Sequence, residues 1–408
     1  MRVAIIGGGA SGLFAGGLLA KANIDTCIFE GNEKLGKKLY ITGKGRCNLT
    51  NDCPVESYLE NVVNGKKFMQ SAINKFNCQD TMKYFEALGC PLKVERGGRV
   101  FPVSDKSSDV IKALAKSASS CDIHLNEKVK TIIKQDNTFK IITDLNSYTF
   151  DKVIVASGGK SYQATGSKGD GYNFAKSFSL NVAPPRSALC PIKLKDDFCK
   201  ALQGLSLKNV KLCAKTESKS YEFFGEMLFT GDGISGPIAL SLASFLNEEK
   251  NVELHIDFKP ALSREQLEER LKRDIASNLN KEASFLIKSL LPKSLIEPFL
   301  QTCNIDKHKK LNSITVKERQ NIVSNLNHFA LSFNGLYPVE SGIITAGGVD
   351  LKEINPKTME AKKVPNLYFI GEVLDIDCLT GGYNLQTAFS TAYACAKAII
   401  EENYVPTI

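Results

Sequence analysis

The sequence predicts an α/β fold whose main domain is discontinuous, and three observations support this prediction. An apolar, β-branched strand opens the chain and runs into a glycine-rich turn and an apolar helix. Apolar strands that end in small residues recur at residues 153–159 and 367–371. Residues 190–329, between these strands, are first strand-like and then charged and helical. Because 408 residues are enough for two or three domains, we expect one domain built from both ends of the chain and carrying an insertion.

The first thirty residues predict a dinucleotide site. An apolar strand, Val3–Ile6, leads into the pattern G-x-G-x-x-G, formed by Gly7, Gly9 and Gly12, and a helix follows. The first glycine permits a tight turn, the second lets a phosphate approach the backbone, and the third lets helix and strand pack closely. Glu30 closes the second strand, where a carboxylate can accept hydrogen bonds from an adenosine ribose. We therefore expect a pyrophosphate at the helix N-terminus; the alternative is a glycine-rich turn in an ordinary βαβ unit.

The composition is typical of a globular protein, with 43% hydrophobic and 24% charged residues. The formal net charge of +8 comes mainly from scattered lysines. The sequence has no arginine-rich block or basic tail, so we expect a small-molecule substrate and no nucleic-acid partner. No run approaches the roughly 18 apolar residues that a membrane span needs. We therefore expect no membrane association and a cytoplasmic location.

Cysteine and histidine usage gives no sign of a metal site. The 12 cysteines fall at irregular intervals, without a C-x-x-C motif or a Cys–His cluster at metal spacing. We therefore expect no bound metal and mostly reduced thiols, as in a cytoplasm. His124, His255, His308 and His328 belong to no motif, so surface or core positions are expected for them.

The loop at residues 34–51 alternates glycine with lysine and arginine. Its backbone N–H groups can line a ligand and its cations can meet phosphate, although a flexible basic loop is the alternative. Helices are predicted within residues 66–89 and from Ser107 to about residue 120. Short strands within residues 129–150 predict a small β-meander.

The middle of the chain predicts two inserted parts. Prolines at 184, 185 and 191 mark a boundary. Short strands follow, and leucines at helical spacing then continue to residue 326. The predicted division is a main domain of residues 1–189 and 330–408, a β-rich, barrel-like part at 190–262, and a helical part at 263–329.

A second G-x-G-x-x-G pattern lies inside the insertion, at Gly231, Gly233 and Gly236. Taken alone it would indicate an NAD(P) site. The surrounding β-rich part is too small for a full nucleotide domain, and Pro237 starts the next helix by ordinary rules. A structural or substrate-facing turn is therefore the favoured interpretation.

Seven stretches together closely resemble one flavoprotein family, the BaiN-like or aminoacetone-oxidase-like FAD-binding enzymes. One departure is Gly231, where histidine is usual in the family. The resemblance implies a flavoprotein core of the type with two dinucleotide-binding domains, an inserted β-barrel and helical bundle, and extended FAD. The matching stretches are GGGASGLFAG (7–16), KLGKKLYITGKGRCNLTN (34–51), GRVFPVSDKSSDV (98–110), SYQATGSKGDGY (161–172), FTGDGISGP (229–237), ITAGGVDLKEINPKTME (344–360) and LYFIGEVLDIDCLTGGYNLQTA (367–388).

The resemblance also implies the residues that bind the cofactor. Its motif positions fall on Gly7, Gly9, Ala10, Ser11, Gly12, Glu30, Lys38, Thr42, Gly43, Gly45, Arg46, Cys47, Asn48, Val129, Ala156, Ser157, Gly158, Gly371, Glu372, Asp375, Gly382, Tyr383, Asn384 and Leu385. Gln386, which follows them, is expected to face the flavin as well.

The start of the last helix has the form that flavin chemistry needs. Reduction builds negative charge on the flavin pyrimidine, and a helix N-terminus offers a charge of about +0.5 and free N–H donors. Thr380–Asn384 before an apolar helix fits this role; a plain capped helix is the alternative. Cys47 is either a redox thiol of low pKa or, as favoured, a loop residue beside the cofactor.

The predicted function is that of an FAD-dependent oxidoreductase, which transfers a hydride between flavin and a small organic substrate. The candidates for substrate or proton contacts are Arg46, Arg99, Tyr162 and Tyr383. Amine, alcohol and enone substrates stay open, as do the reaction direction, the oligomeric state, and NAD(P)H or dioxygen as electron partner. The alternatives are a tRNA-modifying flavoprotein and a non-catalytic flavin-binding protein.

Overall fold

The computed structural model describes residues 1–249 and 251–404, and the chain forms two compact units. The first unit contains Met1–Ala188 and the chain from Pro338 onward, and the second contains Leu189–Tyr337. The return to the first unit was expected at residue 330. It lies later because two strands between Phe329 and Leu336 complete the sheet of the second unit.

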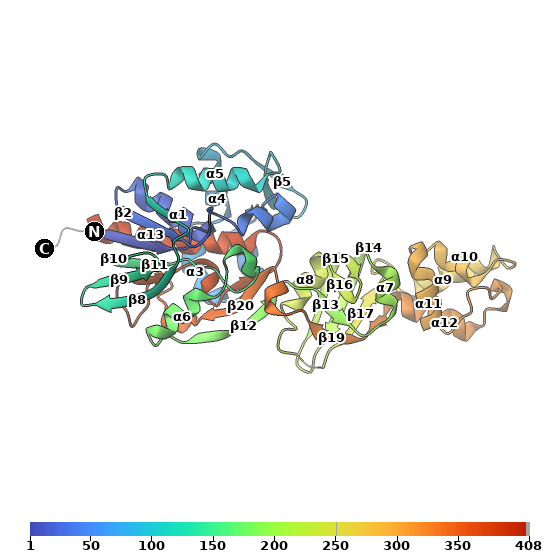
Figure 1. The fold of residues 1–408 in the computed structure, drawn as a ribbon. Helices are drawn as coiled ribbons and strands as arrows, with labels where there is room; N and C mark the ends of the chain where they lie inside the picture. Colours follow the sequence, from blue (N-terminus) through green and yellow to red (C-terminus); the bar gives the residue numbers. More distant parts are fainter. Residues whose placement is uncertain (250, 405–408) are drawn as a thin grey trace. The chain divides into compact units, whose positions relative to one another are not determined.

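The first unit is built on a five-stranded parallel sheet of order β21-β11-β1-β2-β7 (Figure 1). The order places strands from both ends of the sequence side by side, as Val155 of β11 pairs with Phe369 of β21. Val3, Ala4 and Ile5 of β1 are fully buried, as expected of a parallel strand covered on both faces. The predicted α/β fold is confirmed, and it is of the Rossmann type. The strands are β1 (Arg2–Ile6), β2 (Asp25–Glu30), β7 (Asp122–Leu125), β11 (Lys152–Val155) and β21 (Leu367–Phe369).

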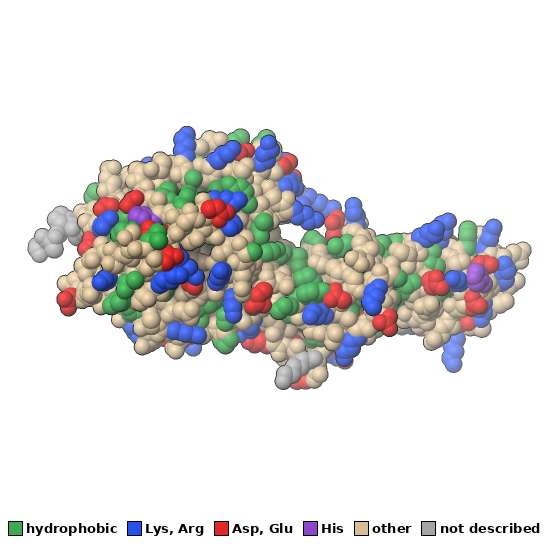
Figure 2. Space-filling view, viewed as in Figure 1, with side chains coloured by type: hydrophobic (Ala, Val, Ile, Leu, Met, Phe, Trp, Pro, Cys, Tyr) green, Lys and Arg blue, Asp and Glu red, His purple; other side chains and the backbone are tan. Residues whose placement is uncertain are grey.

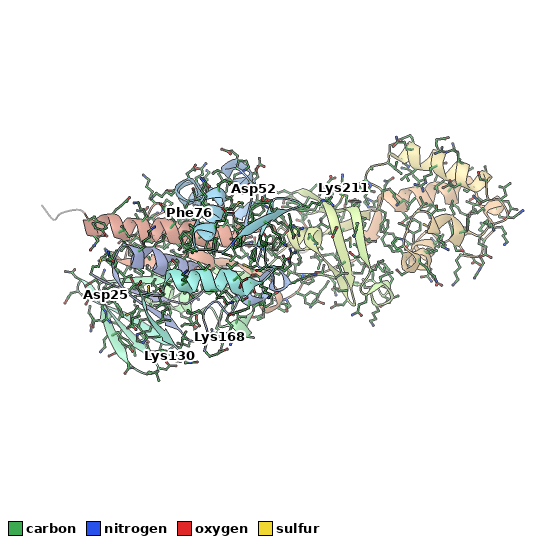
Figure 3. All side chains as sticks on the ribbon, turned by 90° about the horizontal axis from the view of Figure 1, so that it is seen from above. Asp25, Asp52, Phe76, Lys130, Lys168 and Lys211 are labelled. Carbon is green, nitrogen blue, oxygen red and sulfur yellow. The ribbon has the colours of Figure 1, made fainter. Side chains whose placement is uncertain are left out.

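Helices cover this sheet, and α1 packs against both α5 and α13. Aromatic rings fill the space between the helices. Phe76 stacks on Tyr393 of α13 with a centroid distance of 4.8 Å and meets Phe14 of α1 edge-on at 5.1 Å; Figure 3 labels Phe76 beside α13. The helices of this unit are α1 (Ala10–Lys21), α2 (Val55–Glu60), α3 (Lys66–Lys75), α4 (Cys78–Ala87), α5 (Ser107–Ser117), α6 (Asp170–Ser177) and α13 (Tyr383–Tyr404).

Small antiparallel sheets surround the main sheet, and one of them is the predicted β-meander. It has the order β10-β9-β8. The remaining small sheets join segments far apart in sequence, such as β12 with β20. Their strands are β3 (Thr50–Asn51), β4 (Val62–Asn64), β5 (Leu92–Glu95), β6 (Arg99–Pro102), β8 (Val129–Gln135), β9 (Thr138–Thr143), β10 (Ser147–Phe150), β12 (Val182–Ala188), β20 (Ile344–Val349) and β22 (Asp377–Cys378).

The second unit contains a seven-stranded antiparallel sheet of order β18-β17-β14-β15-β16-β13-β19. Its two edge strands are consecutive in the chain and only Ser332 separates them, so the sheet must curl until its edges approach each other. The strands are β13 (Ile192–Leu194), β14 (Ser206–Lys215), β15 (Ser220–Thr230), β16 (Gly233–Ser235), β17 (Glu253–Asp257), β18 (Phe329–Leu331) and β19 (Phe333–Leu336).

Helices complete the second unit, and one apolar cluster contains side chains from both the sheet and the helices. Two of the helices begin with a capping box, at Ser263 and at Thr315, which satisfies N–H groups at a helix start. The helices are α7 (Phe198–Leu202), α8 (Pro237–Ala243), α9 (Arg264–Ala276), α10 (Ala283–Lys288), α11 (Ile296–Thr302) and α12 (Val316–Asn327). Among the residues that the structure describes, no helix is long and apolar enough to cross a membrane.

The second G-x-G-x-x-G pattern lies in a β-hairpin. Thr230 of β15 pairs with Gly233 of β16, and helix α8 starts only at Pro237. A dinucleotide fingerprint needs the strand to pass through the glycines directly into a helix. The structure therefore places a structural turn here, in agreement with the favoured interpretation.

Candidate functional site

The first glycine-rich turn lies at the carboxyl end of β1. The Gly7 N–H donates to the carbonyl oxygen of Phe29 at 2.9 Å. The φ angle of Gly7 is +112°, and a Cβ there would lie 2.5 Å from the Ala156 carbonyl oxygen. A Cβ on Gly12 would overlap the Gly7 carbonyl oxygen. Both positions therefore require glycine, because strand and helix meet without room for a side chain.

Open space remains at the N-terminus of α1. A Cβ on Gly9, the N-cap residue, would meet no described atom within 4 Å. No side chain of the described residues caps this helix start, so its first N–H groups keep their capacity to bind an anion. Ala10 and Ser11 form the first turn, as the pyrophosphate assignment requires.

Glu30 is held rigidly at the end of β2. One carboxylate oxygen accepts from the Gly8 N–H at 2.9 Å. The other accepts from the Asn32 N–H at 2.9 Å and from the Asn32 side chain at 2.6 Å. These bonds fix the carboxylate beside the glycine-rich turn, and its contact with a ribose stays a prediction.

Three buried oxygen atoms near the strand ends have no hydrogen-bond partner among the described residues: Ser157 Oγ, Tyr172 Oη and Asp375 Oδ1. Burial raises the pKa of Asp375, and burial followed by the charges of Glu372 and Asp375 raises that of Tyr172. An unsatisfied buried polar atom costs about 1–3 kcal/mol, so a polar ligand supplying partners fits this place. Ser157 and Asp375 are predicted cofactor residues, whereas sequence reasoning missed Tyr172, because a tyrosine on the buried face of a short amphipathic helix is typical of a core residue.

Lys38 and Glu372 join the basic loop to the strand end. The Lys38 ammonium lies 2.7 Å from the Glu372 carboxylate and also donates to Ser161 Oγ at 2.8 Å. Glu372 accepts in addition from the Thr345 N–H at 3.0 Å. The lysine charge is thus compensated by a protein carboxylate. The preceding residue, Gly371, donates its N–H to the Thr391 hydroxyl of α13 at 3.0 Å.

The basic loop is ordered by its own backbone. The Cys47 N–H donates to the Thr42 carbonyl oxygen at 3.1 Å, and the Arg46 N–H to the Gly43 carbonyl oxygen at 3.2 Å. Burial raises the pKa of Cys47 to about 12, which is the opposite of the shift that a redox thiolate needs. Gly45 and Asn48 belong to the same loop, and Asn48 Oδ1 accepts from the Val100 N–H at 3.2 Å.

Arg46 contacts protein carboxylates. Its guanidinium forms ion pairs with Glu95 and with Asp105, the latter at 2.6 Å, and lies 4.1 Å from the centroid of the Phe101 ring. Arg99 donates to the Arg96 carbonyl oxygen at 3.1 Å. The charge of Arg46 is therefore engaged on the protein surface, and a substrate contact for either arginine stays a prediction.

The start of α13 is tightly packed against β3. Gly382 has a φ of +101°, and a Cβ there would overlap the Thr50 carbonyl oxygen. The Asn384 side chain accepts from the Cys378 N–H at 3.0 Å and donates to its carbonyl oxygen at 2.9 Å. Burial raises the pKa of Tyr383 to about 12. Leu385 packs against the core of the unit.

Gln386 was expected to face the flavin, but its side chain points into the protein core. Its side chain is fully buried, and its oxygen accepts from the hydroxyls of Thr50 at 2.6 Å and Thr81 at 2.8 Å. Its amide donates to the Phe76 carbonyl oxygen at 3.2 Å. The expectation that Gln386 faces the flavin is therefore wrong, because its hydrogen bonds are all used inside the protein to hold α13 in place.

The other predicted residues lie around the same strand ends. The Ala156 N–H donates to the Ile6 carbonyl oxygen at 2.9 Å and thereby continues the pairing of β11 with β1. After this strand, Gly158 and Tyr162 both have left-handed backbone conformations, and the φ angle of Tyr162 is 52°. Val129 is buried at the start of β8.

A parallel sheet with this glycine turn, this acid and this helix start defines a Rossmann-type, dinucleotide-binding protein. The chain belongs to the family described as HI0933-like protein Rossmann domain, whose model matches residues 1–398. This finding confirms the predicted flavoprotein family.

Relatives of known name cover nearly the whole chain. A ribosomal RNA dihydrouridine synthase of Haemophilus influenzae is 32% identical over 409 residues, which are 97% of this chain and 97% of that protein. The Escherichia coli protein of the same name is 32% identical over 402 residues, with the same coverage. A 3-dehydro-bile acid delta(4,6)-reductase of Clostridium scindens is 30% identical over 409 residues, which are 98% of this chain and 99% of that protein.

Solved structures share the fold at low identity. The open conformation of a flavocytochrome c3 fumarate reductase matches with a TM-score of 0.50 and 15% identity, over 99% of this chain and 78% of that chain. A 3-ketosteroid delta1-dehydrogenase from Sterolibacterium denitrificans matches with a TM-score of 0.50 and 10% identity, over 98% and 99% of the two chains. At these identities the likeness concerns the fold alone.

Proposed function

We propose that this flavoprotein reduces a carbon–carbon double bond that is conjugated with a carbonyl group. The observation that carries the proposal is that full-length relatives with two different names share one type of chemistry. The name of one describes formation of dihydrouridine, and that of the other describes a delta(4,6)-reductase of a 3-dehydro-bile acid. Among the amine, alcohol and enone classes, this chemistry favours the enone class.

The residues present fit FAD, because the open helix start at Gly9 suits a phosphate, and the partnerless oxygens of Ser157 and Asp375 suit hydroxyl groups of the same ligand. When bound and reduced, FAD supplies the two electrons of the reaction as a hydride. The turn from Gly7 to Gly12 would hold its pyrophosphate and Glu30 its ribose. The N-terminus of α13 would stabilise negative charge on the reduced ring.

Tyr383 is our candidate for the proton that the reduced double bond needs. Its pKa of about 12 keeps the hydroxyl protonated at neutral pH, and its ring is buried at the start of α13. We expect Tyr383→Phe to slow the step in which substrate reoxidises the flavin by about 10²–10⁴-fold, while reduction of the flavin keeps its rate. Stopped-flow measurements of the two half-reactions separate these effects, and equal slowing of both would contradict the assignment.

The substrate class is tested by anaerobic half-reactions of the purified protein with its FAD. Protein reduced by dithionite is mixed with a 3-oxo-4-ene steroid, and oxidised protein is mixed with amines and alcohols. The proposal expects the enone to restore the flavin absorbance and the amines and alcohols to leave it unchanged. Bleaching by an amine or an alcohol, without reoxidation by an enone, would overturn the proposal.

We propose NADH or NADPH as the electron donor, because a net reduction needs a hydride source from outside the protein. The nucleotide would act transiently, since the second glycine pattern forms a hairpin and offers no second dinucleotide fold. Anaerobic bleaching by either nucleotide supports this. If neither bleaches the flavin, a different donor is required.

A nucleobase in RNA is a second candidate substrate, favoured by the names of the two relatives at 32% identity and by the net charge of +8. On the face in view, lysines and arginines alternate with acidic side chains (Figure 2). Binding to ribosomal RNA fragments that weakens steeply with salt, together with dihydrouridine found by mass spectrometry after turnover, would support this candidate. Failure to bind at low salt would remove it.

A further inference from the structure

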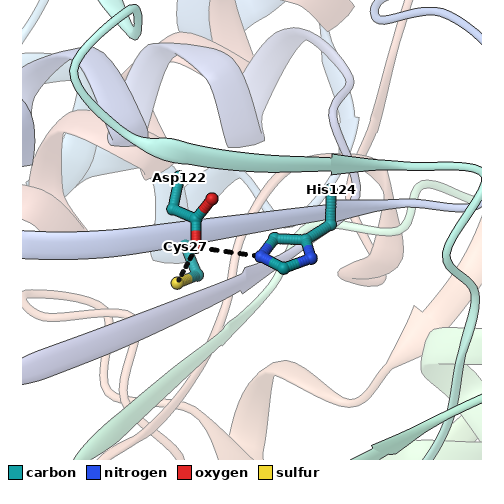
Figure 4. Close-up of side chains that lie close together, drawn as sticks. All are labelled: Cys27, Asp122 and His124. Carbon is teal, nitrogen blue, oxygen red and sulfur yellow. Dashed lines mark hydrogen bonds and ion pairs between the residues drawn. The ribbon is translucent and has the colours of Figure 1, made fainter. Parts of the chain in front are cut away.

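Three possible metal ligands from two neighbouring strands lie together in the first unit. Cys27 of β2 pairs directly with Asp122 of β7, and His124 follows two residues later on the same strand. Side chains two residues apart share one face of a sheet, and paired residues of parallel strands lie side by side. The three ligand atoms all lie within 4.8 Å of one another (Figure 4).

The distances are close to those of a zinc site. Asp122 Oδ2 lies 3.5 Å from Cys27 Sγ and 2.9 Å from His124 Nε2. Ligand atoms at about 2.0–2.3 Å from a tetrahedral zinc are separated by roughly 3.3–3.8 Å. Small side-chain rotations therefore suffice to admit the ion. A thiolate, an imidazole and a carboxylate form a donor set that suits zinc.

The surroundings of His124 fix the orientation of its ring. Nδ1 of the imidazole lies 2.8 Å from the buried carboxylate of Glu127, which also accepts from the Thr143 hydroxyl at 2.7 Å. With Nδ1 engaged by Glu127, Nε2 is the ring nitrogen that faces Asp122, and it lies on the side of Cys27 as well. A carboxylate behind a histidine is the usual arrangement at zinc sites.

We propose that Cys27, Asp122 and His124 bind one Zn²⁺ ion, with water as the fourth ligand. The thiol proton leaves to solvent on binding, as a zinc-bound cysteine is a thiolate. Arg2 Nη2 lies 3.6 Å from Cys27 Sγ and has to turn away, which its 42% exposed side chain permits. The Asp122 side chain is 61% exposed, so the ion can enter from solvent. Zinc would then fasten the edge strand β7 to β2.

Sequence reasoning expected no metal because it considered spacing along the chain. Cys27 and Asp122 are 95 residues apart in sequence. The pairing register of two parallel strands brings these residues together. No local sequence motif predicts that register.

The test uses the full-length protein with its FAD, freed of metal by a chelator and then titrated with Zn²⁺ in competition with a chromophoric chelator. We expect one zinc per chain. The variants Cys27→Ser and His124→Gln should weaken zinc binding at least tenfold, and Glu127→Gln, which removes the group that positions His124, should weaken it about 10–100-fold. Cys213→Ser and His308→Gln, which alter a buried strand cysteine and a histidine paired with Glu282, serve as matched controls and should bind as the unchanged protein does.

Zinc binding that is absent, or unchanged in both Cys27→Ser and His124→Gln, overturns the proposal. Asp122→Asn guards against a folding defect, because this exposed side chain can change with little effect on the core, and retained flavin absorbance shows that the variant is folded. A folded Asp122→Asn protein with weakened zinc binding supports the site. A folded one with unchanged binding contradicts the role of Asp122.

Discussion

Two segments of this protein carry the same letter pattern, G-x-G-x-x-G, and have different structures. At Gly7–Gly12 the chain passes from a buried parallel strand directly into helix α1. At Gly231–Gly236 it turns back into the antiparallel strand β16. In both segments one glycine permits close packing, since a Cβ on Gly12 would overlap the Gly7 carbonyl oxygen and one on Gly233 the Ile192 carbonyl oxygen. What distinguishes them is the open helix start beside Gly9, which only the first segment has.

The largest expected contrast tests this open space. Gly9→Ala adds a methyl group that meets no described atom, so the apoprotein should keep its thermal stability. It should nevertheless lose FAD, because the methyl group takes the place of the phosphate. Gly233→Ala should lower the free energy of unfolding of the second unit by about 1–3 kcal/mol and keep FAD. Flavin content per protein and thermal melting give both answers; loss of FAD in Gly233→Ala would show that the second pattern binds nucleotide.

A second expected contrast between the two units is the pH dependence of their stability, which Asp377 of the first unit should cause. Burial, followed by the charge of Asp375 and opposed by Arg186, raises the pKa of Asp377 from 3.8 to about 7. The unfolded chain releases this proton near pH 4, so the stabilising contribution is complete below that pH and is lost as pH rises to 7. The loss in the apoprotein should reach up to about 4 kcal/mol.

Hydrogen exchange can follow this loss in each unit separately. The loss should occur in the first unit, and Asp377→Asn should abolish it. An equal pH dependence of the variant and the unchanged protein would contradict the buried, protonated state of this acid.

A third, smaller contrast uses two partnerless buried hydroxyls, Ser157 in the first unit and Thr230 beside the second glycine pattern. Ser157→Ala and Thr230→Val should each stabilise the apoprotein by about 1–2 kcal/mol, because each removes an unsatisfied polar atom. Only Ser157→Ala should weaken FAD binding, by about tenfold. Chemical unfolding and flavin titration measure the two effects, and equal FAD affinity in both variants would exclude Ser157 from the cofactor site.

The smallest expected difference concerns thiols. Burial raises the pKa of Cys47 in the first unit and of Cys303 in the second to about 12. Both should react equally slowly with iodoacetamide in the folded protein, because alkylation needs the thiolate. Peptide mass spectrometry after timed labelling would show this. Faster labelling of Cys47 would restore the redox-thiol alternative.

Much of the fold was predictable because it depends on local patterns. The apolar strand before Gly7 and the glycine-bounded helices gave the α/β fold correctly, since periodicity and turn residues act over a few positions. The point at which the chain returns to the first unit was predicted about eight residues too early. The sequence of Phe333–Leu336 does not show to which sheet this strand belongs. Its pairing with β13 joins segments more than a hundred residues apart.

The sequence by itself determined the glycine turn and helix start of a dinucleotide site, because backbone sterics and apolar periodicity are local. The FAD-binding oxidoreductase class followed from the resemblance of seven stretches to one flavoprotein family. Only the tertiary structure decided that Gln386 faces the core, that Tyr172 is buried where the charges of Glu372 and Asp375 act on it, and that Cys27, Asp122 and His124 meet. These contacts depend on strand register and on helix packing between distant segments. Their loop-closure entropy is offset only when the whole core forms, so no short stretch of sequence encodes them.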